Sequence, residues 1–362
     1  MTKLHELHQH GQAVWLDFIS RDLIESGELD RLIGQGLRGM TSNPKIFDQA
    51  ISEGDAYNAQ LADLAQEGSE PLDAYEAIAI KDIQAAADKL HSVYNETNGR
   101  DGYVSLEVNP HLAYETEATI AEVRRLHDRV DRQNVMFKVP ATPHGVVAVR
   151  RLTRLGININ ITLMFTLSHY NAVAQAYIDG LEACHQNGGD VSKVASVASF
   201  FVSRVDAKLD PMLEEAGAQH LKGKIAIANA KTVYKRFQQM FSGERWAALA
   251  AAGAQVQRPL WASTSTKDPA YSDTLYVDSL IGSDTVNTMP PETLQAFLDH
   301  GTVAQTIDRN VEEADVQLNQ LVQYGIELLE VGDELQREGV EKFIKPFDAL
   351  LATITQHARA TS

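Results

Sequence analysis

The stretch Ile157-Asn158-Ile159-Asn160-Ile161-Thr162 alternates isoleucines with polar side chains, which is the period of a β-strand. A helical spacing of apolar residues precedes it, with Val146, Val149 and Leu152 on one face. A second helical pattern follows at 167–185. A strand between two helices is the repeating unit of a parallel sheet that helices cover. The stretch therefore predicts an α/β fold in which the isoleucines meet the helices and the polar face points inward.

The same alternation of strands and helices extends over the whole chain. The strand-like runs are 14–17, 37–41, 103–108, 135–139, 157–162, 194–202, 259–264 and 275–280. Long helical patterns occupy 70–98, 167–185, 222–252, 309–337 and 340–358. Eight strand–helix units predict a single (β/α)8 TIM barrel with additional helices, including a C-terminal helix. A doubly wound open sheet is the alternative.

Composition excludes several classes of protein. The chain has 362 residues, with 32 Lys+Arg against 49 Asp+Glu and a net charge of −17, which argues against non-specific nucleic-acid binding. No run approaches the ~20 apolar residues of a membrane span, and the N-terminus is too polar for a signal peptide. Cys184 is the sole cysteine, as is typical of a reducing compartment. Without a linker-like tract, we expect one cytoplasmic domain over 1–362.

Several of the predicted strands carry polar side chains that a covered parallel sheet does not need. They are Ser105 and Glu107 in 103–108, Lys138 in 135–139, Asp17 at the end of the first run and Asp278 in the eighth. A single alternating strand usually has one face in water, and a strand-terminal aspartate often caps the next helix. Together, however, these groups predict a cluster inside the barrel mouth, where barrel enzymes keep their catalytic residues.

Lys138 carries the most specific prediction. It lies between Phe137 and Val139-Pro140, and no acidic residue occurs within five positions on either side. Burial disfavours a charged lysine and lowers its pKa, which exposes the lone pair of a neutral amine. Such an amine attacks ketones and aldehydes to form a Schiff base, whose iminium draws electrons during C–C bond cleavage. The alternative is a lysine that reaches solvent from an edge strand.

Seven segments, in order along the chain, resemble the transaldolase family and its longer bacterial subgroup in particular. They are 14–17 (Val-Trp-Leu-Asp) with Ser20-Arg21 after it, 41–44 (Thr-Ser-Asn-Pro), 104–108 (Val-Ser-Leu-Glu-Val), 137–142 (Phe-Lys-Val-Pro-Ala-Thr), 158–163 (Asn-Ile-Asn-Ile-Thr-Leu), 199–204 (Ser-Phe-Phe-Val-Ser-Arg) and 261–264 (Trp-Ala-Ser-Thr). The shorter relatives that act as fructose-6-phosphate aldolases match less well.

The resemblance implies an enzyme of the pentose phosphate pathway that uses no cofactor and no metal. It would transfer a dihydroxyacetone unit from sedoheptulose 7-phosphate to glyceraldehyde 3-phosphate, giving erythrose 4-phosphate and fructose 6-phosphate. By resemblance, Lys138 forms the Schiff base and Asp17 takes the proton from the C4 hydroxyl. Glu107 and Thr162 are similar to the pair that activates a water molecule during imine formation and hydrolysis.

The resemblance also implies which residues bind the substrate. These are Asn43 and Asn160 for the dihydroxyacetone hydroxyls, Ser199 beside the imine, and Arg204, Ser263 and Lys267 for the phosphate. Shorter transaldolases have a second arginine soon after the position of Ser263. Here the chain reads Ser-Thr-Ser-Thr-Lys over 263–267, so Lys267 is expected to supply that charge.

Other interpretations remain open at this level. The residues 34–39 spell GxGxxG, but they follow a helical pattern and lead into a strand, so a dinucleotide site is rejected. A catalytically silent barrel could bind a sugar phosphate or a partner protein. A plain aldolase would pass the dihydroxyacetone carbanion to water instead of an aldehyde. The chain could be a monomer or a homodimer.

Overall fold

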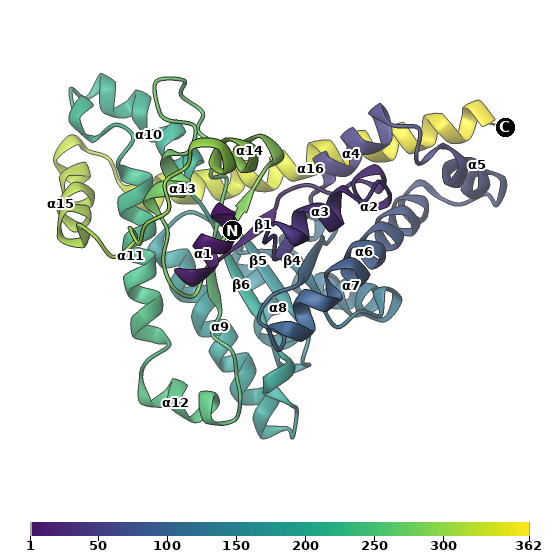
Figure 1. The fold of residues 1–362 in the computed structure, drawn as a ribbon, viewed down its shortest axis with the longest axis horizontal. Coiled ribbons are helices and arrows are strands. Elements are labelled where there is room, and N and C mark those ends of the chain that lie inside the picture. Colours follow the sequence, from purple (N-terminus) through teal and green to yellow (C-terminus); the bar gives the residue numbers. More distant parts are fainter. Residues whose placement is uncertain (1, 362) are drawn as a thin grey trace.

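Eight parallel strands, paired in chain order, form a closed barrel at the centre of the molecule (Figure 1). The computed structural model describes residues 2–361. The strands are β1 (Gln12–Leu16), β2 (Gly39–Thr41), β3 (Tyr103–Glu107), β4 (Val135–Pro140), β5 (Ile159–Met164), β6 (Ser196–Phe201), β7 (Arg258–Ala262) and β8 (Thr285–Met289). The last strand pairs with the first, with Val14 opposite Asn287. The predicted (β/α)8 barrel is confirmed, and the open sheet is wrong.

Helices surround the barrel and extend beyond it. They are α1 (Lys3–Gln9), α2 (Arg21–Glu25), α3 (Glu28–Gly34), α4 (Pro44–Glu53), α5 (Asn58–Gln66), α6 (Pro71–Glu96), α7 (Thr116–Val130), α8 (Pro143–Arg154), α9 (Leu167–Gln186), α10 (Ser203–Glu215), α11 (Ile225–Met240), α12 (Glu244–Ala251), α13 (Leu275–Ser279), α14 (Pro291–His300), α15 (Val311–Leu321) and α16 (Leu328–Thr361). Short 3-10 helices are η1 (Pro110–Leu112), η2 (Val191–Lys193), η3 (Gln219–Leu221) and η4 (Val322–Tyr324).

Side-chain caps start the helices directly after the strands that carry the polar groups. After β4, the Thr142 hydroxyl accepts a hydrogen bond from the Gly145 N–H at 3.0 Å. After β5, the Thr166 hydroxyl accepts one from the His169 N–H at 3.2 Å. Each cap satisfies a backbone donor that the first helical turn leaves free. The caps therefore fix the chain directly after the carboxyl ends of β4 and β5, where it turns from strand into helix.

The strands are buried along their whole length, and their apolar and polar faces are separated as the sequence predicts. In β4, the Phe137 ring faces outward, 6.0 Å from the ring of His127 on α7. In β5, the isoleucines Ile159 and Ile161 are fully buried. The intervening Asn160 bonds to side chains of β3 and β6 inside the barrel. Residue alternation thus places polar groups in the barrel interior and apolar groups under the helices.

The prediction of the eighth strand is wrong. Most of the run 275–280 forms the short helix α13 (Leu275–Ser279), and the strand comes afterwards, at Thr285–Met289. Asp278 therefore does not reach the barrel mouth. Its carboxylate accepts hydrogen bonds from the Thr274 hydroxyl, directly before α13, and from the Thr302 N–H, which fastens α13 to the loop after α14. The apolar run of α13 is more strand-like than the Thr-Val-Asn-Thr-Met of β8, in which three of the five side chains are polar.

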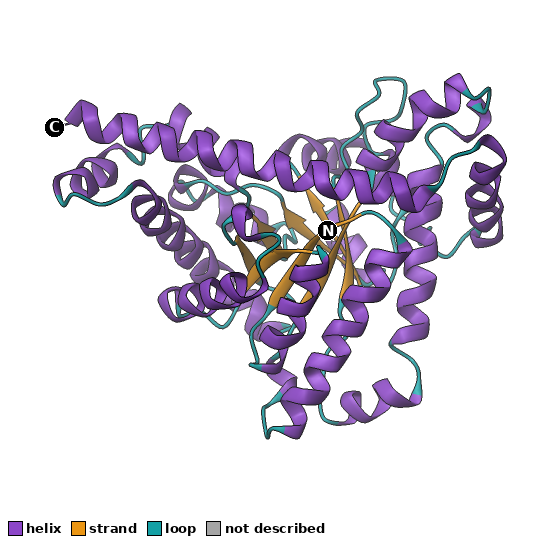
Figure 2. Ribbon diagram, turned by 180° about the vertical axis from the view of Figure 1, so that it is seen from behind, coloured by secondary structure: helices purple, strands orange, loops and turns teal. Residues whose placement is uncertain are grey.

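Three of the predicted helical patterns, 222–252, 309–337 and 340–358, have other bounds in the structure. The pattern 222–252 is divided into α11 and α12 by a turn that includes Gly243. The break predicted near 338–339 lies instead before α16, where Gly325 adopts a left-handed φ of 69°. As a result α16 is one helix of 34 residues. It crosses one end of the barrel (Figure 2) and packs against α4, α5, α6 and α10.

Within residues 2–361, no helix has the length and hydrophobicity required to cross a membrane.

Candidate active site

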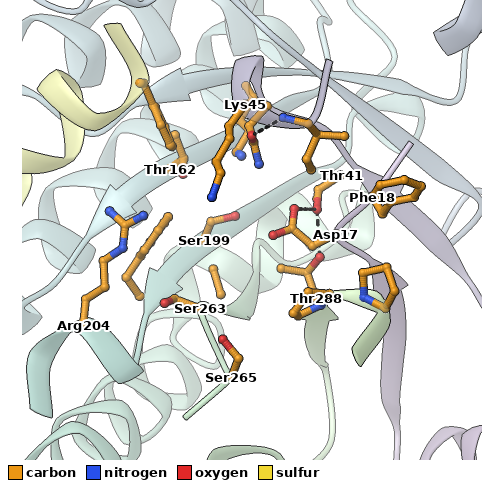
Figure 3. A pocket seen from close by; sticks show the side chains of 18 of the residues that line it. Asp17, Phe18, Thr41, Lys45, Thr162, Ser199, Arg204, Ser263, Ser265 and Thr288 are labelled. Carbon is orange, nitrogen blue, oxygen red and sulfur yellow. Dashed lines mark hydrogen bonds between the residues drawn. The ribbon is translucent and has the colours of Figure 1, made fainter. Parts of the chain in front are cut away.

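A cavity of about 460 Å³ opens at the carboxyl end of the barrel (Figure 3). Eight of the ten predicted site residues line it: Asp17, Asn43, Lys138, Thr162, Ser199, Arg204, Ser263 and Lys267. Glu107 and Asn160 are buried and do not line it. The barrel thus brings together side chains that are widely separated in the sequence.

Strand register places the central groups side by side. Glu107 of β3 lies opposite Lys138 of β4, and Lys138 lies opposite Asn160 of β5. Lys138 Nζ is 3.6 Å from Glu107 Oε2 and donates a hydrogen bond to the Ser42 carbonyl at 3.3 Å. Both side chains of the ion pair are more than nine-tenths buried. The amine therefore opens into the cavity while a carboxylate lies beside it.

Glu107 has an unusual environment for a carboxylate. Neither of its oxygens has a hydrogen-bond partner within residues 2–361, and the 3.6 Å contact to Lys138 is slightly longer than a hydrogen bond. Burial raises the pKa of Glu107 to about 7, although the ammonium of Lys138 acts in the opposite direction. The Asp17 carboxylate raises this pKa further. A carboxyl group with this pKa can give up or take a proton near neutrality.

A hydroxyl–amide chain runs beneath the cavity. The Asn160 amide donates to the Ser105 hydroxyl at 3.0 Å, and the Ser199 hydroxyl donates to Asn160 Oδ1 at 2.6 Å. Thr162, two residues along β5, lines the cavity, and its buried hydroxyl has no protein partner in the part of the chain that the structure describes. That hydroxyl is therefore free to bind a water molecule or a substrate.

Asp17 is fixed at the end of β1 on the opposite side of the cavity from Arg204 (Figure 3). The Thr41 hydroxyl donates to Asp17 Oδ1 at 2.7 Å, and the Asp17 N–H donates to the Met289 carbonyl at 2.7 Å. A second hydroxyl, on Thr288, lies 2.8 Å from Thr41 Oγ1. The cap of α2 is Ser20. The interpretation of Asp17 as a helix cap is therefore wrong.

Arg204 lies in the first turn of α10, with its guanidinium 5.1 Å from the centre of the Phe201 ring. Its buried Nη1 has no hydrogen-bond partner within residues 2–361. Burial lowers the pKa of Arg204, and the carboxylates of Asp17 and Glu338 oppose this effect. An unpaired guanidinium facing a polar cavity is suited to bidentate binding of an anion.

Ser263 lies beside the first turn of α10. Its backbone has a left-handed φ of 54°, and its carbonyl accepts a hydrogen bond from the Ser203 N–H at 2.9 Å. The two hydroxyls, Ser263 Oγ and Ser203 Oγ, are also 2.9 Å apart. The turn after β7 is thereby fastened to α10, next to Arg204.

Lys267 is exposed at the rim of the cavity and donates a hydrogen bond to the Ser265 hydroxyl at 2.7 Å. Partial burial of the ammonium group lowers the pKa of Lys267, and repulsion by Arg204 and Lys45 adds to this effect. Glu292 acts in the opposite direction. Besides Lys138, three basic side chains, Lys45, Arg204 and Lys267, therefore line one cavity of a chain whose net charge is −17.

Sequence reasoning missed several of the lining residues. Lys45 comes two positions after Asn43, whose Oδ1 caps α4 by accepting from the Ile46 N–H, so its position beside a motif was the available signal. Phe343 had no such signal, because it belongs to α16. The centre of its ring lies 5.4 Å from Lys138 Nζ, and it forms a wall of the cavity over the amine.

Comparison with known families agrees with this geometry. Residues 14–354 match the family model described as "Transaldolase/Fructose-6-phosphate aldolase". The chain belongs to this family. The resemblance to transaldolases seen in the sequence is thereby confirmed, and so are the transferase class and the barrel fold that it implies.

Individual relatives match over nearly their whole length. A protein from Parafrankia sp. named "Transaldolase" is 49% identical, over 98% of this chain and 97% of its own. One of the same name from Thermobifida fusca is 47% identical, over 99% of both chains. The "Transaldolase" of Trichodesmium erythraeum is 44% identical, over 98% of this chain and 97% of its own.

Proposed function

We propose that this chain is a transaldolase that transfers a dihydroxyacetone unit from sedoheptulose 7-phosphate to glyceraldehyde 3-phosphate through a Schiff base on Lys138. One observation carries the proposal: a buried lysine amine opens into a polar cavity, 3.6 Å from a carboxyl group whose pKa is about 7. The products are erythrose 4-phosphate and fructose 6-phosphate. The reaction needs no cofactor and no metal ion.

The first half-reaction forms the covalent intermediate. Lys138 Nζ attacks the C2 ketone of the donor, and the carbinolamine loses its hydroxyl as water. Glu107 supplies the proton for that loss, through a water molecule bound to the Thr162 hydroxyl. The iminium then draws the electron pair of the C3–C4 bond as that bond breaks. Asp17 accepts the C4 hydroxyl proton, and erythrose 4-phosphate departs.

The second half-reaction reverses these steps with a new partner. The bound enamine attacks the aldehyde carbon of glyceraldehyde 3-phosphate, and Asp17 returns its proton to the new C4 oxygen. Water, activated by Glu107 and Thr162, then hydrolyses the imine and frees Lys138. Each of the two carboxyl groups moves a different proton, and such a transfer contributes about 10²–10⁴-fold to the rate.

Binding groups surround the reacting atoms. Arg204, Ser263 and Lys267 hold the phosphate, with help from Lys45 and Ser265. The carbonyl end of the donor lies deeper, where Asn43 and Ser199 bind the dihydroxyacetone hydroxyls, and Asn160, which does not line the cavity, orients the Ser199 hydroxyl beside the imine. The support for this orientation is that the cations lie around the opening while the amide–hydroxyl chain of Asn160 lies beneath the cavity.

Borohydride trapping tests the covalent step. The protein is incubated with fructose 6-phosphate, reduced with borohydride and digested, and the peptides are mapped by mass spectrometry. We expect a reduced dihydroxyacetone adduct on the Lys138 peptide. The adduct should be absent from the variant Lys138→Met. The control is Lys231→Met, which should retain the adduct. Lys231 is also largely buried, but its ammonium group donates to the Arg309 carbonyl. A folded wild-type protein without an adduct would overturn the proposal and leave a silent binding barrel.

A second measurement separates a transferase from a plain aldolase. Fructose 6-phosphate is supplied with and without erythrose 4-phosphate as the acceptor, and both free dihydroxyacetone and sedoheptulose 7-phosphate are measured. A transaldolase forms the seven-carbon product quickly and releases little free dihydroxyacetone. Equal rates of dihydroxyacetone release under both conditions would identify an aldolase.

We further propose a cytoplasmic location, consistent with the single, buried and unpaired Cys184. The oligomeric state, monomer or homodimer, is decided by measuring the mass of the purified protein in solution.

A further inference from the structure

Helix α16 makes an unusual contact with the two strands that carry Lys138 and Thr162. Its residue Gln336, 8% exposed, donates hydrogen bonds from Nε2 to the carbonyl oxygens of Ala141 and Leu163, each at 3.0 Å. Ala141 directly follows β4, and Leu163 lies at the carboxyl end of β5. A primary amide has two N–H donors, so one side chain serves both strands.

The contact lies where the regular strand pairing stops. The register between β4 and β5 ends with Pro140 opposite Thr162, and the Ala141 N–H donates to the Thr162 carbonyl at 2.7 Å. The next carbonyls on the two strands, those of Ala141 and Leu163, are the ones that Gln336 binds. The amide thus extends the pairing of the strands by one position beyond their own hydrogen bonds.

Leu163 has a backbone conformation that needs such support. Its φ is 63°, in the left-handed region that a branched side chain seldom adopts, and the pairing of β5 with β6 is irregular between Ile161 and Met164. Strained residues of this kind persist where the surrounding structure holds them, and they concentrate at functional sites. Thr162, whose hydroxyl faces the cavity, is the residue directly before the strained one.

The approach of α16 to these strands depends on two glycines. A Cβ on Gly339 would lie 2.8 Å from Leu163 Cδ2, and a Cβ on Gly332 would lie 2.1 Å from Thr166 Cγ2. Both distances are shorter than real Cβ contacts allow. Gln336 lies between these two glycines in the helix.

We propose that Gln336 is a positioning residue of the reaction, because it fixes the carboxyl ends of β4 and β5 and thereby the placement of Lys138 relative to Thr162. The inference rests on the proposed function, in which these two side chains act on the same carbon atom of the substrate. Gln336 does not line the cavity. Its loss therefore slows imine formation without weakening substrate binding.

The test compares Gln336→Met with the matched variant Gln12→Met. Gln12 is also buried and donates from Nε2 to the Leu280 carbonyl at 2.7 Å, but it lies at the amino end of β1. Three quantities are measured: the single-turnover rate of borohydride-trapped adduct from fructose 6-phosphate, the KM for this sugar and the melting temperature. We expect Gln336→Met to slow adduct formation about 10- to 100-fold with KM within about threefold of wild type. Gln12→Met lowers only the melting temperature.

A second variant keeps the test decisive if Gln336→Met does not fold. Gln336→Glu has the same shape, but its ionised carboxylate cannot donate hydrogen bonds. Once protonated, it can donate one, so its adduct rate relative to wild type should rise as the pH falls. Any of three results would overturn the inference. Gln336→Met could form the adduct at the wild-type rate, or Gln12→Met could lose as much of the adduct rate as Gln336→Met does. The third is a ratio of the Gln336→Glu rate to the wild-type rate that does not change with pH. Failure of the proposed function is distinct, because the wild-type protein itself would then form no adduct.

Discussion

At the scale of single residues, the isolation of Glu107 has a measurable consequence. Burial raises the pKa of this carboxyl from the ordinary value of 4.5 to about 7, so the group is largely protonated below pH 7 and ionised above it. As a proton donor to the carbinolamine it is active in the protonated form. Imine formation should therefore slow as the pH rises through about 7.

The variant Glu107→Gln tests this assignment. We expect it to lower the rate of adduct formation by about 10²–10⁴-fold and to remove the inflection near pH 7 from the profile. Rates are measured by quenched mass spectrometry between about pH 6 and pH 8. The control is Glu122→Gln, because burial also raises the pKa of Glu122, whose carboxylate accepts the Asn109 N–H. An inflection that persists in Glu107→Gln would show that another group titrates.

Lys267 offers a second prediction for a single residue. Its ammonium group lies at the rim, where Arg204 and Lys45 repel it, and a bound phosphate would relieve that repulsion. We expect Lys267→Met to raise the KM for glyceraldehyde 3-phosphate about tenfold, equivalent to ~1.4 kcal/mol, and to leave kcat within about threefold. Lys193→Met, which removes an exposed lysine just before β6 at the opposite end of the barrel, should change neither constant. An unchanged KM in Lys267→Met would remove Lys267 from the phosphate site.

At the scale of elements, the position of α16 depends on close packing. Because a Cβ on Gly332 would overlap the methyl group of Thr166, Gly332→Ala must displace either the helix or the residue that caps α9. We expect a loss of about 1–3 kcal/mol in the free energy of unfolding, measured by chemical denaturation. Gly34→Ala is the matched control. Gly34 ends α3 with no atom near its missing Cβ, so alanine should be neutral or stabilising there. Equal stabilities for the two variants would contradict this packing argument.

The elements also show which parts of the fold can be predicted from the sequence. Strands such as β4 and β5 are predictable because alternation and flanking helices identify them without tertiary information. The eighth strand is not, since the side chains of Asn287 and Thr288 find their partners, Thr264 and Thr41, only in the folded barrel. The run 275–280 has strand-like side chains, yet hydrogen bonds of Asp278 to Thr274 and Thr302 hold it as a helical turn.

The same distinction applies to the candidate site. The polar strand faces predict Lys138, Glu107 and Asp17, because strand ends meet at one edge of any parallel barrel. The contributions of Gln336 and Phe343 are not predictable from local pattern. In the sequence both belong to an amphipathic helix, and only the path of α16 across the barrel mouth brings them to Lys138 and its strand.

At the scale of the whole molecule, basic side chains gather in the cavity although the chain as a whole is acidic. The chain carries −17, yet Lys45, Arg204 and Lys267 gather in one cavity. Local cations can attract an anionic substrate regardless of the total charge. The affinity for a sugar phosphate should therefore depend on ionic strength, because salt screens exposed charges beyond about 10 Å at 0.1 M.

We expect the KM for fructose 6-phosphate to rise severalfold between about 20 mM and 300 mM salt while kcat stays nearly constant, as screening weakens the attraction. Steady-state kinetics over a sodium chloride series provide the measurement. Unphosphorylated fructose serves as the control, since its KM should not respond to salt. A parallel response of the two sugars would show that salt acts on the protein and not on phosphate recognition.

The path of α16 also has a consequence for biosynthesis. All eight strands, including the β8 that closes the barrel by pairing with β1, precede α16 in the chain, so α16 is synthesised after them. A chain that ended before residue 328 would lack the ring of Phe343 over Lys138 and the amide of Gln336 across the two strands. Because α16 follows all eight strands in the chain, we expect Lys138 to gain its complete surroundings only once α16 has packed over the barrel.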